Sequence, residues 1–337
     1  MTDPRALHAR LFTIDTHIDI PWPDRGDAFG PSERRVDLAK MQAGGLKAGC
    51  FAAYVPQGPR TAEAEHAAFT RAQAMLAAIG GMAGNHNGIR ARTAHSAAEI
   101  EAAAEEGALA IVPAVENGYA IGTELDRLDA LAALGARYLT LTHNGHNALG
   151  DAAVPRADLG DTATLHGGLS EFGRAAIARL NALGMLVDVS HTAKSTMLEA
   201  VSLSQSPVVA THASIHALCP HPRNLDDEQL DALAAKGGVV QITAVPAFLR
   251  PHAKESEVGP ADFADHIDYA VRRIGIAHVG ISSDFDGGGG FRGWRDAAES
   301  PNITEELASR GYDEAALRLL WGGNFLRAMR AAEALAE

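Results

Sequence analysis

Cysteine and basic residues are both scarce in this sequence. Only Cys50 and Cys219 occur among its 337 residues, and they provide neither a disulfide framework nor the spacing of a zinc finger. Lys and Arg number 29 against 42 Asp and Glu, which gives a formal net charge of -13. An acidic chain without a basic, aromatic-laced stretch argues against nucleic acid as a partner.

Long hydrophobic runs are absent as well. No run approaches the length of a membrane span, so we expect no membrane partner. Residues 1–10 mix charged side chains with Pro4 and lack the apolar core of a signal peptide, so export directed by this end of the chain is not expected. The simplest location is therefore a reducing cytoplasm.

Short apolar runs alternate with longer helical patterns about eight times along the chain. Most of the runs are continuous rather than alternating, as expected of parallel strands that are covered on both faces. A hydrophobic share of 47% supplies ample material for a core. The predicted strands cover residues 11–16, 46–55, 108–115, 138–142, 185–190, 208–211, 239–243 and 278–283.

Helical patterns fit between these strands and end at glycines. The alternation without a long linker predicts one (β/α)8 TIM barrel over residues 1–337, with active-site loop insertions at about 145–168 and 284–300. A doubly wound open sheet is the competing architecture, but it requires a glycine-rich turn where this chain carries His17 and Asp19. The predicted helices cover residues 61–79, 124–134, 170–183, 226–236 and 262–274, and a further helix begins at the capping box Ser96–Glu99. A C-terminal helical region runs from about Thr304 and is interrupted at Gly311 and at Gly322 and Gly323.

Polar residues that can bind a divalent metal follow six of the eight predicted strands. His17 and Asp19 stand two positions apart, so an extended chain presents both side chains on the same side. Each residue alone also fits an isolated solvated side chain or, for histidine, a helix cap. Reactive residues of TIM barrels project from the C-terminal ends of the strands, so the whole set predicts one site. The set is His17 and Asp19, Glu116, His143, His191, His212 and Asp284.

The number of candidate ligands suggests two metal ions. His17, Asp19, His191 and His212 can serve two ions together with one further carboxylate only if that carboxylate bridges them, and Glu116 is the natural bridge. Two ions about 3.5–4 Å apart would hold a hydroxide between them at neutral pH, because metal coordination lowers the pKa of water.

These motifs together resemble the renal (membrane) dipeptidase family of zinc metallopeptidases, a branch of the amidohydrolase superfamily. The resemblance implies a barrel of the metallo-dependent hydrolase type, in which His17, Asp19 and Glu116 hold one Zn²⁺ and Glu116, His191 and His212 hold the other. It extends over the whole chain through Ile14–Trp22, Val115–Gly118, Leu139–His143, Asp188–His191, Thr211–Ser214 and Ser283–Gly287.

The resemblance also implies roles for three further residues. His143 would contact the scissile carbonyl and its tetrahedral intermediate, and Arg223 would receive the terminal carboxylate of the substrate. Asp284 would pass the proton of the attacking water to the leaving amine, with Asp286 as its rival. From the residues alone, Arg223 reads as a surface-loop arginine.

The predicted function is therefore a binuclear zinc dipeptidase that cleaves free dipeptides by attack of a metal-bridging hydroxide. Acceptance of a D-residue at the C-terminal position is implied by the resemblance only. One alternative is another amidohydrolase, but many of these enzymes use a modified lysine as the bridging ligand, and residues 138–143 contain no lysine. The other alternative is a non-catalytic barrel that binds a metal or a peptide, but such a protein would have no use for a proton carrier at Asp284. Manganese or cobalt could replace zinc, and a homodimer is one open assembly.

Unlike the animal members, this chain shows no secretion signal, lipid-anchor tail or sheltered cysteine pair, which predicts a bacterial-type cytoplasmic form. Substrate side chains are expected to meet the loops 21–31, 145–168 and 245–251.

Overall fold

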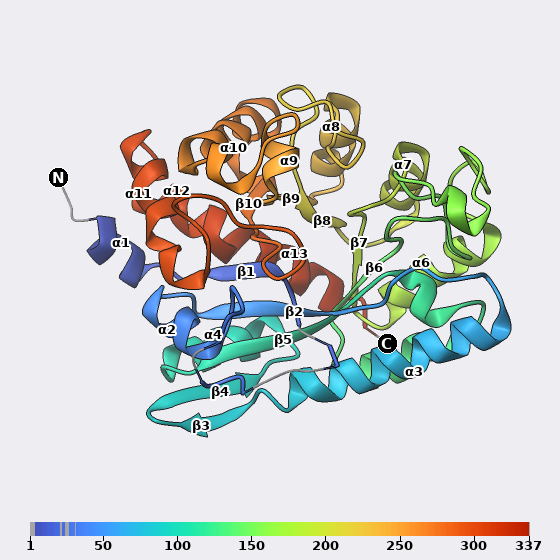
Figure 1. Cartoon of the computed structure of the whole chain (residues 1–337), viewed down its shortest axis with the longest axis horizontal. Helices are drawn as coiled ribbons and strands as arrows, with labels where there is room; N and C mark the ends of the chain where they lie inside the picture. Colours follow the sequence, from blue (N-terminus) through green and yellow to red (C-terminus); the bar gives the residue numbers. More distant parts are fainter. Residues whose placement is uncertain (1–3, 21, 24–26, 31, 337) are drawn as a thin grey trace.

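Eight parallel strands form the predicted (β/α)8 barrel in the computed structural model, which describes residues 4–20, 22–23, 27–30 and 32–336 (Figure 1). Each predicted strand corresponds to a barrel strand, which confirms the fold class. Neighbouring strands pair in the order β1-β2-β5-β6-β7-β8-β9-β10. Their bounds are β1 Ile14–Asp19, β2 Ala48–Tyr54, β5 Leu109–Glu116, β6 Tyr138–Thr140, β7 Leu186–Asp188, β8 Val209–Ala213, β9 Val239–Ile242 and β10 Val279–Ile281.

The barrel closes between its first and last strands just beyond the end of β10. Ile18 forms a parallel bridge with Phe285. The Asp19 amide donates to the Phe285 carbonyl at 3.0 Å, and the Asp284 amide donates to the His17 carbonyl at 3.1 Å. Closure therefore brings the beginning of the chain beside residues that follow it by more than 260 positions.

β1 lies later in the chain than the sequence predicts. Leu11 follows helix α1 (Pro4–Arg10) directly, and its amide bonds to the His8 carbonyl at 3.0 Å. Leu11 is fully buried because it packs as part of this helix end rather than as a strand residue. The strand accordingly extends to Asp19, so His17 and Asp19 belong to the strand itself.

A hairpin outside the barrel was not predicted. β3 (Gly84–His86) pairs antiparallel with β4 (Ile89–Thr93), and β4 adds to β5 in parallel (Figure 1). Both residues of the connecting turn, Asn87 and Gly88, have positive φ angles of 50° and 82°. Asn-Gly is the characteristic sequence of such a two-residue turn, so the signal was present.

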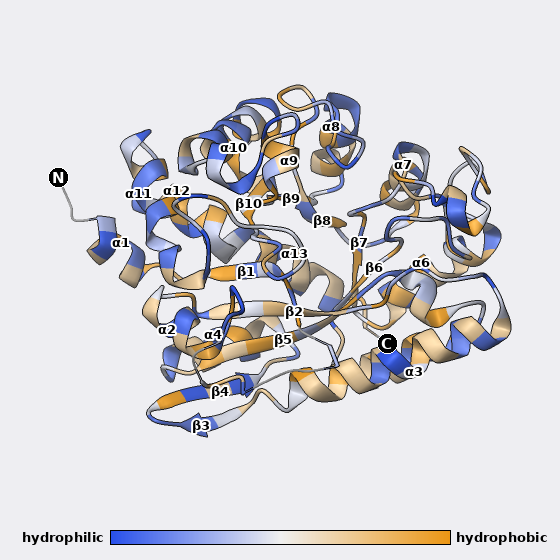
Figure 2. Cartoon of the chain, viewed as in Figure 1, coloured by the Kyte–Doolittle hydropathy of each residue, from blue (hydrophilic) through white to orange (hydrophobic). Residues whose placement is uncertain are grey.

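The predicted helices are present to within about two residues at each end, and one further long helix, α7, was not predicted. The C-terminal region is interrupted around Gly311 and by a π-helical turn, Leu319–Gly323, as the glycines there predict. Figure 2 shows hydrophobic residues along β2 and β5, whereas α8 and α10 mix both kinds. The remaining helices are α2 Leu38–Ala43, α3 Ala62–Gly80, α4 Ala97–Glu105, α5 Asp126–Ala133, α6 Glu171–Ala182, α7 Lys194–Leu203, α8 Asp227–Ala235, α9 Pro246–Leu249, α10 Pro260–Ile274, α11 Pro301–Ser309, α12 Glu314–Arg318 and α13 Asn324–Glu333.

Helix α13 packs at the end of the barrel where the strands begin. Phe325, Leu326 and Met329 share a buried cluster with residues near the starts of the barrel strands, among them Ile14 and Val239. This packing leaves the opposite end, where the strands finish, to the loops. Within the described ranges, no helix is long and apolar enough to cross a membrane.

Candidate metal centre and active site

Histidines on or just beyond four other barrel strands converge on the carboxylate of Glu116, which ends β5. Glu116 is 3% exposed, although a carboxylate is rarely buried without a partner. The distances from its oxygens to the Nε2 atoms of the histidines are 3.6 Å to His17, 3.2 Å to His191, 3.4 Å to His212 and 3.9 Å to His143. Residues that are up to 195 positions apart in the sequence thus meet at one point, as predicted from the strand ends.

The two oxygens of Glu116 face different histidines. Oε2 is the atom nearest His17, whose Nε2 is also 3.7 Å from Asp19 Oδ1. Oε1 is the atom nearest His191 and His212. One oxygen is therefore available on each side of the carboxylate, which is the arrangement that a bridging ligand requires.

Buried charge determines the protonation of this centre. Burial raises the pKa of Glu116, but the charge of His17 and the hydrogen bonds from His17, His191 and His212 together outweigh it and hold the pKa of this carboxyl well below its ordinary value. Burial also lowers the pKa of His212 to about 3 and that of His191 well below the ordinary histidine value. Burial lowers the pKa of His17, but Glu116 and Asp19 together outweigh it and raise this pKa well above the ordinary histidine value. An ionised carboxylate and neutral imidazoles are the forms that bind metal, so metal binding requires the neutral form of His17 as well.

Three buried atoms at this centre have no hydrogen-bond partner: His17 Nε2, His212 Nε2 and Asp19 Oδ1. Buried polar atoms are normally paired, so these three indicate a missing ligand of positive charge. Nitrogen and carboxylate oxygen donors in this number fit zinc, manganese or cobalt. By distance alone, the donors form two groups that share Glu116, one with His17 and His212 and one with His143 and His191.

Neighbouring side chains fix the orientation of two of these imidazoles. The Tyr138 hydroxyl donates to the Thr16 carbonyl at 3.0 Å and lies 2.9 Å from His17 Nδ1, so it must accept a proton from that nitrogen. The Asn144 side-chain oxygen, 3.2 Å away, accepts from His191 Nδ1. Both arrangements leave the Nε2 lone pair directed at the centre, and neither Tyr138 nor Asn144 was singled out from the sequence.

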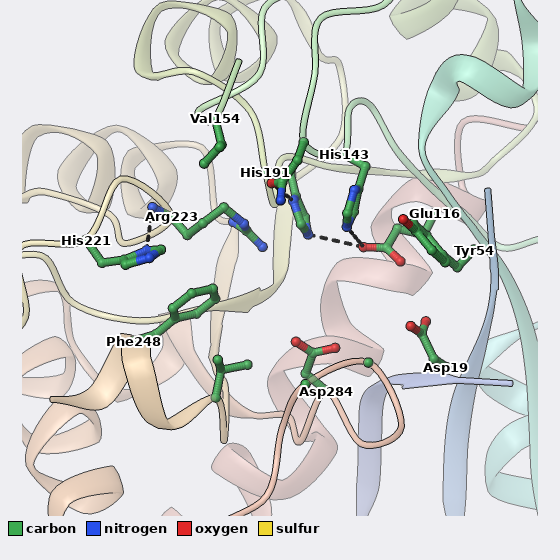
Figure 3. Close-up of a pocket in the computed structure, with 14 residues that line it drawn as sticks. Asp19, Tyr54, Glu116, His143, Val154, His191, His221, Arg223, Phe248 and Asp284 are labelled. Carbon is green, nitrogen blue, oxygen red and sulfur yellow. Dashed lines mark hydrogen bonds and ion pairs between the residues drawn. The ribbon is translucent and has the colours of Figure 1, made fainter. Parts of the chain in front are cut away.

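A cavity of about 430 Å³ opens beside the metal centre. Figure 3 shows Arg223, His221 and Phe248 on one side of it and Asp19 and Tyr54 on the other, with Glu116, His143 and His191 between them. The cavity therefore runs from a cationic end past the candidate metal ligands.

Arg223 is buried in this cavity rather than exposed on a surface loop, so the interpretation from its neighbouring residues was wrong. Its residue exposure is 4%, and its guanidinium carbon lies 5.4 Å from the centre of the Phe248 ring. Burial lowers its pKa to about 10, a value at which the guanidinium still carries its charge at neutral pH. Its Nε atom is buried and has no hydrogen-bond partner.

Asp284 lines the cavity, whereas Asp286 does not. The Asp286 carboxylate instead accepts the backbone amides of Arg35 at 2.8 Å and Val36 at 3.2 Å. Burial raises the pKa of Asp284 well above the ordinary aspartate value, and the charges of Asp19 and Glu116 add to the shift. Asp284 has a φ of 58° and His191 one of 65°, so two residues of the site occupy a backbone region that is unfavourable for side chains other than Asn, Asp and His.

The predicted insertion 145–168 is held together by a buried carboxylate of its own. Asp151 accepts the amides of Leu165, His166 and Gly167 within 3.0 Å, and Val154 lines the cavity. Val245 and Phe248 contribute from the loop 245–251, and Gly287 and Gly288 contribute from 284–300. In the loop 21–31, residues 21, 24–26 and 31 lie outside the described residues.

Comparison with known proteins agrees with this geometry. The sequence profile of the family described as membrane dipeptidase (peptidase family M19) matches residues 1–337. Dipeptidase verJ of Clonostachys rogersoniana is 31% identical over 342 residues, covering 97% of this chain and 86% of that protein. A second fungal dipeptidase, aclJ of Aspergillus oryzae, is 36% identical over 232 residues, which are 68% of this chain and only 53% of that protein.

Solved structures give the same result. The probable dipeptidase PvdM from Pseudomonas aeruginosa superposes with a TM-score of 0.92 and 30% identity, covering 99% of this chain and 98% of the other. A metallopeptidase from Rhodobacter sphaeroides, solved with a phosphinate mimic of L-Ala-D-Ala, gives a TM-score of 0.80 and 25% identity over 96% of this chain and 99% of the other. The chain therefore belongs to the membrane dipeptidase family, peptidase family M19, whose members are hydrolases acting on peptide bonds.

Proposed function

We propose that this protein is a binuclear zinc dipeptidase that hydrolyses the peptide bond of free dipeptides. The observation that carries the proposal is the Glu116 carboxylate, whose Oε2 faces His17 while its Oε1 faces His191 and His212. His17, Asp19 and Glu116 would hold one ion, and Glu116, His191 and His212 the other. When bound, the two ions would supply a water of lowered pKa and polarise the scissile carbonyl.

The side chains around the cavity would position and protonate the substrate. Arg223 binds the terminal carboxylate with its planar guanidinium. His143 contacts the carbonyl oxygen and stabilises the negative charge that develops on it. Asp284 accepts the proton of the attacking water and delivers it to the leaving amine, a role that suits a carboxyl whose pKa is raised by burial.

Size and charge of the cavity favour a dipeptide over a longer peptide. A volume of about 430 Å³ lies within the range of small-molecule sites, and the buried Arg223 lines its cationic end. The Rhodobacter sphaeroides relative, solved with a mimic of L-Ala-D-Ala, supports acceptance of a C-terminal D-residue here as well. A different amide or ester substrate is the remaining alternative within the superfamily.

Removal of metal provides the first test. Dialysis against a chelator should abolish cleavage of a mixed library of L,L- and L,D-dipeptides, and two equivalents of Zn²⁺ per chain should restore it. The measurements are released amino acids and bound zinc on the same preparation. Zinc-loaded protein that binds dipeptides but cleaves none of them would identify a binding protein instead.

Replacement of Arg223 by lysine tests the recognition of the carboxylate. Lysine keeps the charge but loses the paired donors, so kcat/KM for a free dipeptide should fall roughly 10²- to 10³-fold, corresponding to about 3–4 kcal/mol. The decisive comparison is with the C-terminal amide of the same dipeptide. The wild type should prefer the free acid strongly, and Arg223→Lys should reduce that preference; an unchanged preference would remove Arg223 from carboxylate binding.

A further inference from the structure

Asp188 ends β7 inside the barrel and has no role in the reaction proposed above. It is fully buried and is not among the side chains that line the substrate cavity. A fully buried carboxylate so near the metal centre nevertheless requires an explanation, because burying a charge is costly unless it is extensively hydrogen-bonded.

The donors around Asp188 divide between its two oxygens. Oδ1 accepts the Ser190 amide at 3.0 Å, the Ser190 hydroxyl at 2.8 Å and the Thr211 amide at 2.9 Å. Oδ2 accepts two hydroxyls, from Thr140 at 2.6 Å and from Thr211 at 2.7 Å. Because a carboxylate offers only lone pairs, each of these hydroxyls donates its single proton to Asp188.

The Thr211 hydroxyl therefore meets its other neighbours as an acceptor. The nearest is Nδ1 of His212, at 2.9 Å, and Ser190 Oγ and His17 Nδ1 lie farther away, at 3.4 Å and 3.5 Å. With the Thr211 proton directed at Asp188, the proton between Thr211 and His212 must belong to the imidazole. Nδ1 of His212 then carries the hydrogen, and Nε2 presents its lone pair 3.4 Å from Glu116 Oε1, where it has no hydrogen-bond partner.

We propose that Asp188, acting through Thr211, holds His212 in the one tautomer that can bind metal through Nε2. Asp188 and Thr211 are thus positioning residues, and neither touches the substrate. Ligating histidines commonly donate their second nitrogen to a carboxylate or carbonyl, and here a threonine hydroxyl transmits the same constraint. The inference rests on the proposed metal centre, because only a metal ion makes the choice of tautomer matter.

Asp188→Asn provides a test that preserves shape and reverses hydrogen bonds. Two backbone amides point at Oδ1 and cannot reverse, so the amide oxygen of Asn must occupy that position. Its NH₂ group then faces Thr140 and Thr211, and the Thr211 hydroxyl has to accept. The free proton of Thr211 turns to His212 Nδ1, which moves the imidazole proton to Nε2. Zinc affinity should fall by about 10- to 100-fold.

Two threonines allow a matched comparison. Thr140 and Thr211 are both fully buried and donate to the same oxygen of Asp188, but Thr211 alone of the two contacts His212. Thr140→Val should leave the zinc dissociation constant near that of the wild type, whereas Thr211→Val should raise it about 10-fold. Thr211→Ser keeps the hydroxyl and should restore tight binding.

The readout is zinc affinity by competition with a chromogenic chelator on the full chain, with melting curves of the zinc-free proteins as the folding control. Nitrogen chemical shifts of the zinc-free protein should show an unprotonated Nε2 of His212 in the wild type and a protonated one in Asp188→Asn. Equal losses of affinity in the two valine variants, or wild-type affinity in Asp188→Asn, would overturn the inference and leave the dipeptidase proposal standing. Failure of the wild type to bind zinc would overturn both.

Discussion

Replacing Glu116 with glutamine is expected to lower kcat/KM for a dipeptide by at least about 10³-fold and to leave fewer than two zinc ions per chain. The carboxylate presents one charged oxygen toward His17 and the other toward His191 and His212. Glutamine keeps the shape but offers a single neutral oxygen, and its NH₂ group would face one of the two cations. Zinc per chain, measured by mass spectrometry alongside turnover, checks this prediction.

Glu65 supplies the matched control for this change. It is also a buried glutamate, 8% exposed, but it lies on α3 and does not line the substrate cavity. Glu65→Gln should retain two zinc ions and turnover within about twofold of the wild type, since it removes no ligand. Two zinc ions retained in Glu116→Gln would mean that the carboxylate does not bridge.

Replacing Asp284 with asparagine is expected to lower kcat by about 10²- to 10⁴-fold while zinc content stays near that of the wild type. The substitution removes the group that we propose accepts and returns the proton. Asparagine is the appropriate replacement because the backbone φ of 58° lies in a region that Asn tolerates and Ala does not. Single-turnover kinetics and zinc analysis on one preparation separate the chemical step from metal binding.

Asp286→Asn tests whether the loss is specific to position 284. Asp286 has a similar φ of 64° and belongs to the same loop, but its carboxylate accepts the backbone amides of Arg35 and Val36. Its replacement should cost about 1 kcal/mol of stability through the lost hydrogen bond and only a small part of the turnover. If the two variants lose turnover equally, the loop as a whole rather than the Asp284 carboxyl is responsible.

The fold could be predicted from the sequence because parallel strands covered on both faces leave continuous apolar runs. The hairpin of β3 and β4 was missed because its strands are short: β3 is wholly exposed, and β4 alternates buried Ile89 and Ala91 with exposed arginines. Only Asn87 and Gly88 marked it. The start of β1 was predicted too early because the apolar Leu11 packs at the end of helix α1. Local composition does not distinguish an apolar residue that packs at a helix end from one that begins a strand.

The convergence of the candidate ligands on Glu116 followed from the rule that strand ends share one rim of a barrel. The burial of Arg223 did not follow, because it depends on Phe248, which lies 25 positions later and packs beneath the guanidinium only in the folded chain. Tyr138, Thr211 and Asp188 were missed as supporting residues for the same reason. In the sequence they stand beside apolar strand residues, and only the three-dimensional structure shows which atoms their side-chain oxygens contact.

The join between the first and last barrel strands has a mechanical consequence. Backbone hydrogen bonds join His17 to Asp284 and Asp19 to Phe285. The barrel is therefore closed by the two segments that carry the proposed metal ligands of β1 and the proposed proton carrier. An ion bound by His17 and Asp19 on β1 and by Glu116 on β5, two strands away, would link these two strands of the barrel. We expect removal of the ion to loosen β1, one of the two strands that close the barrel, as well as to abolish the reaction.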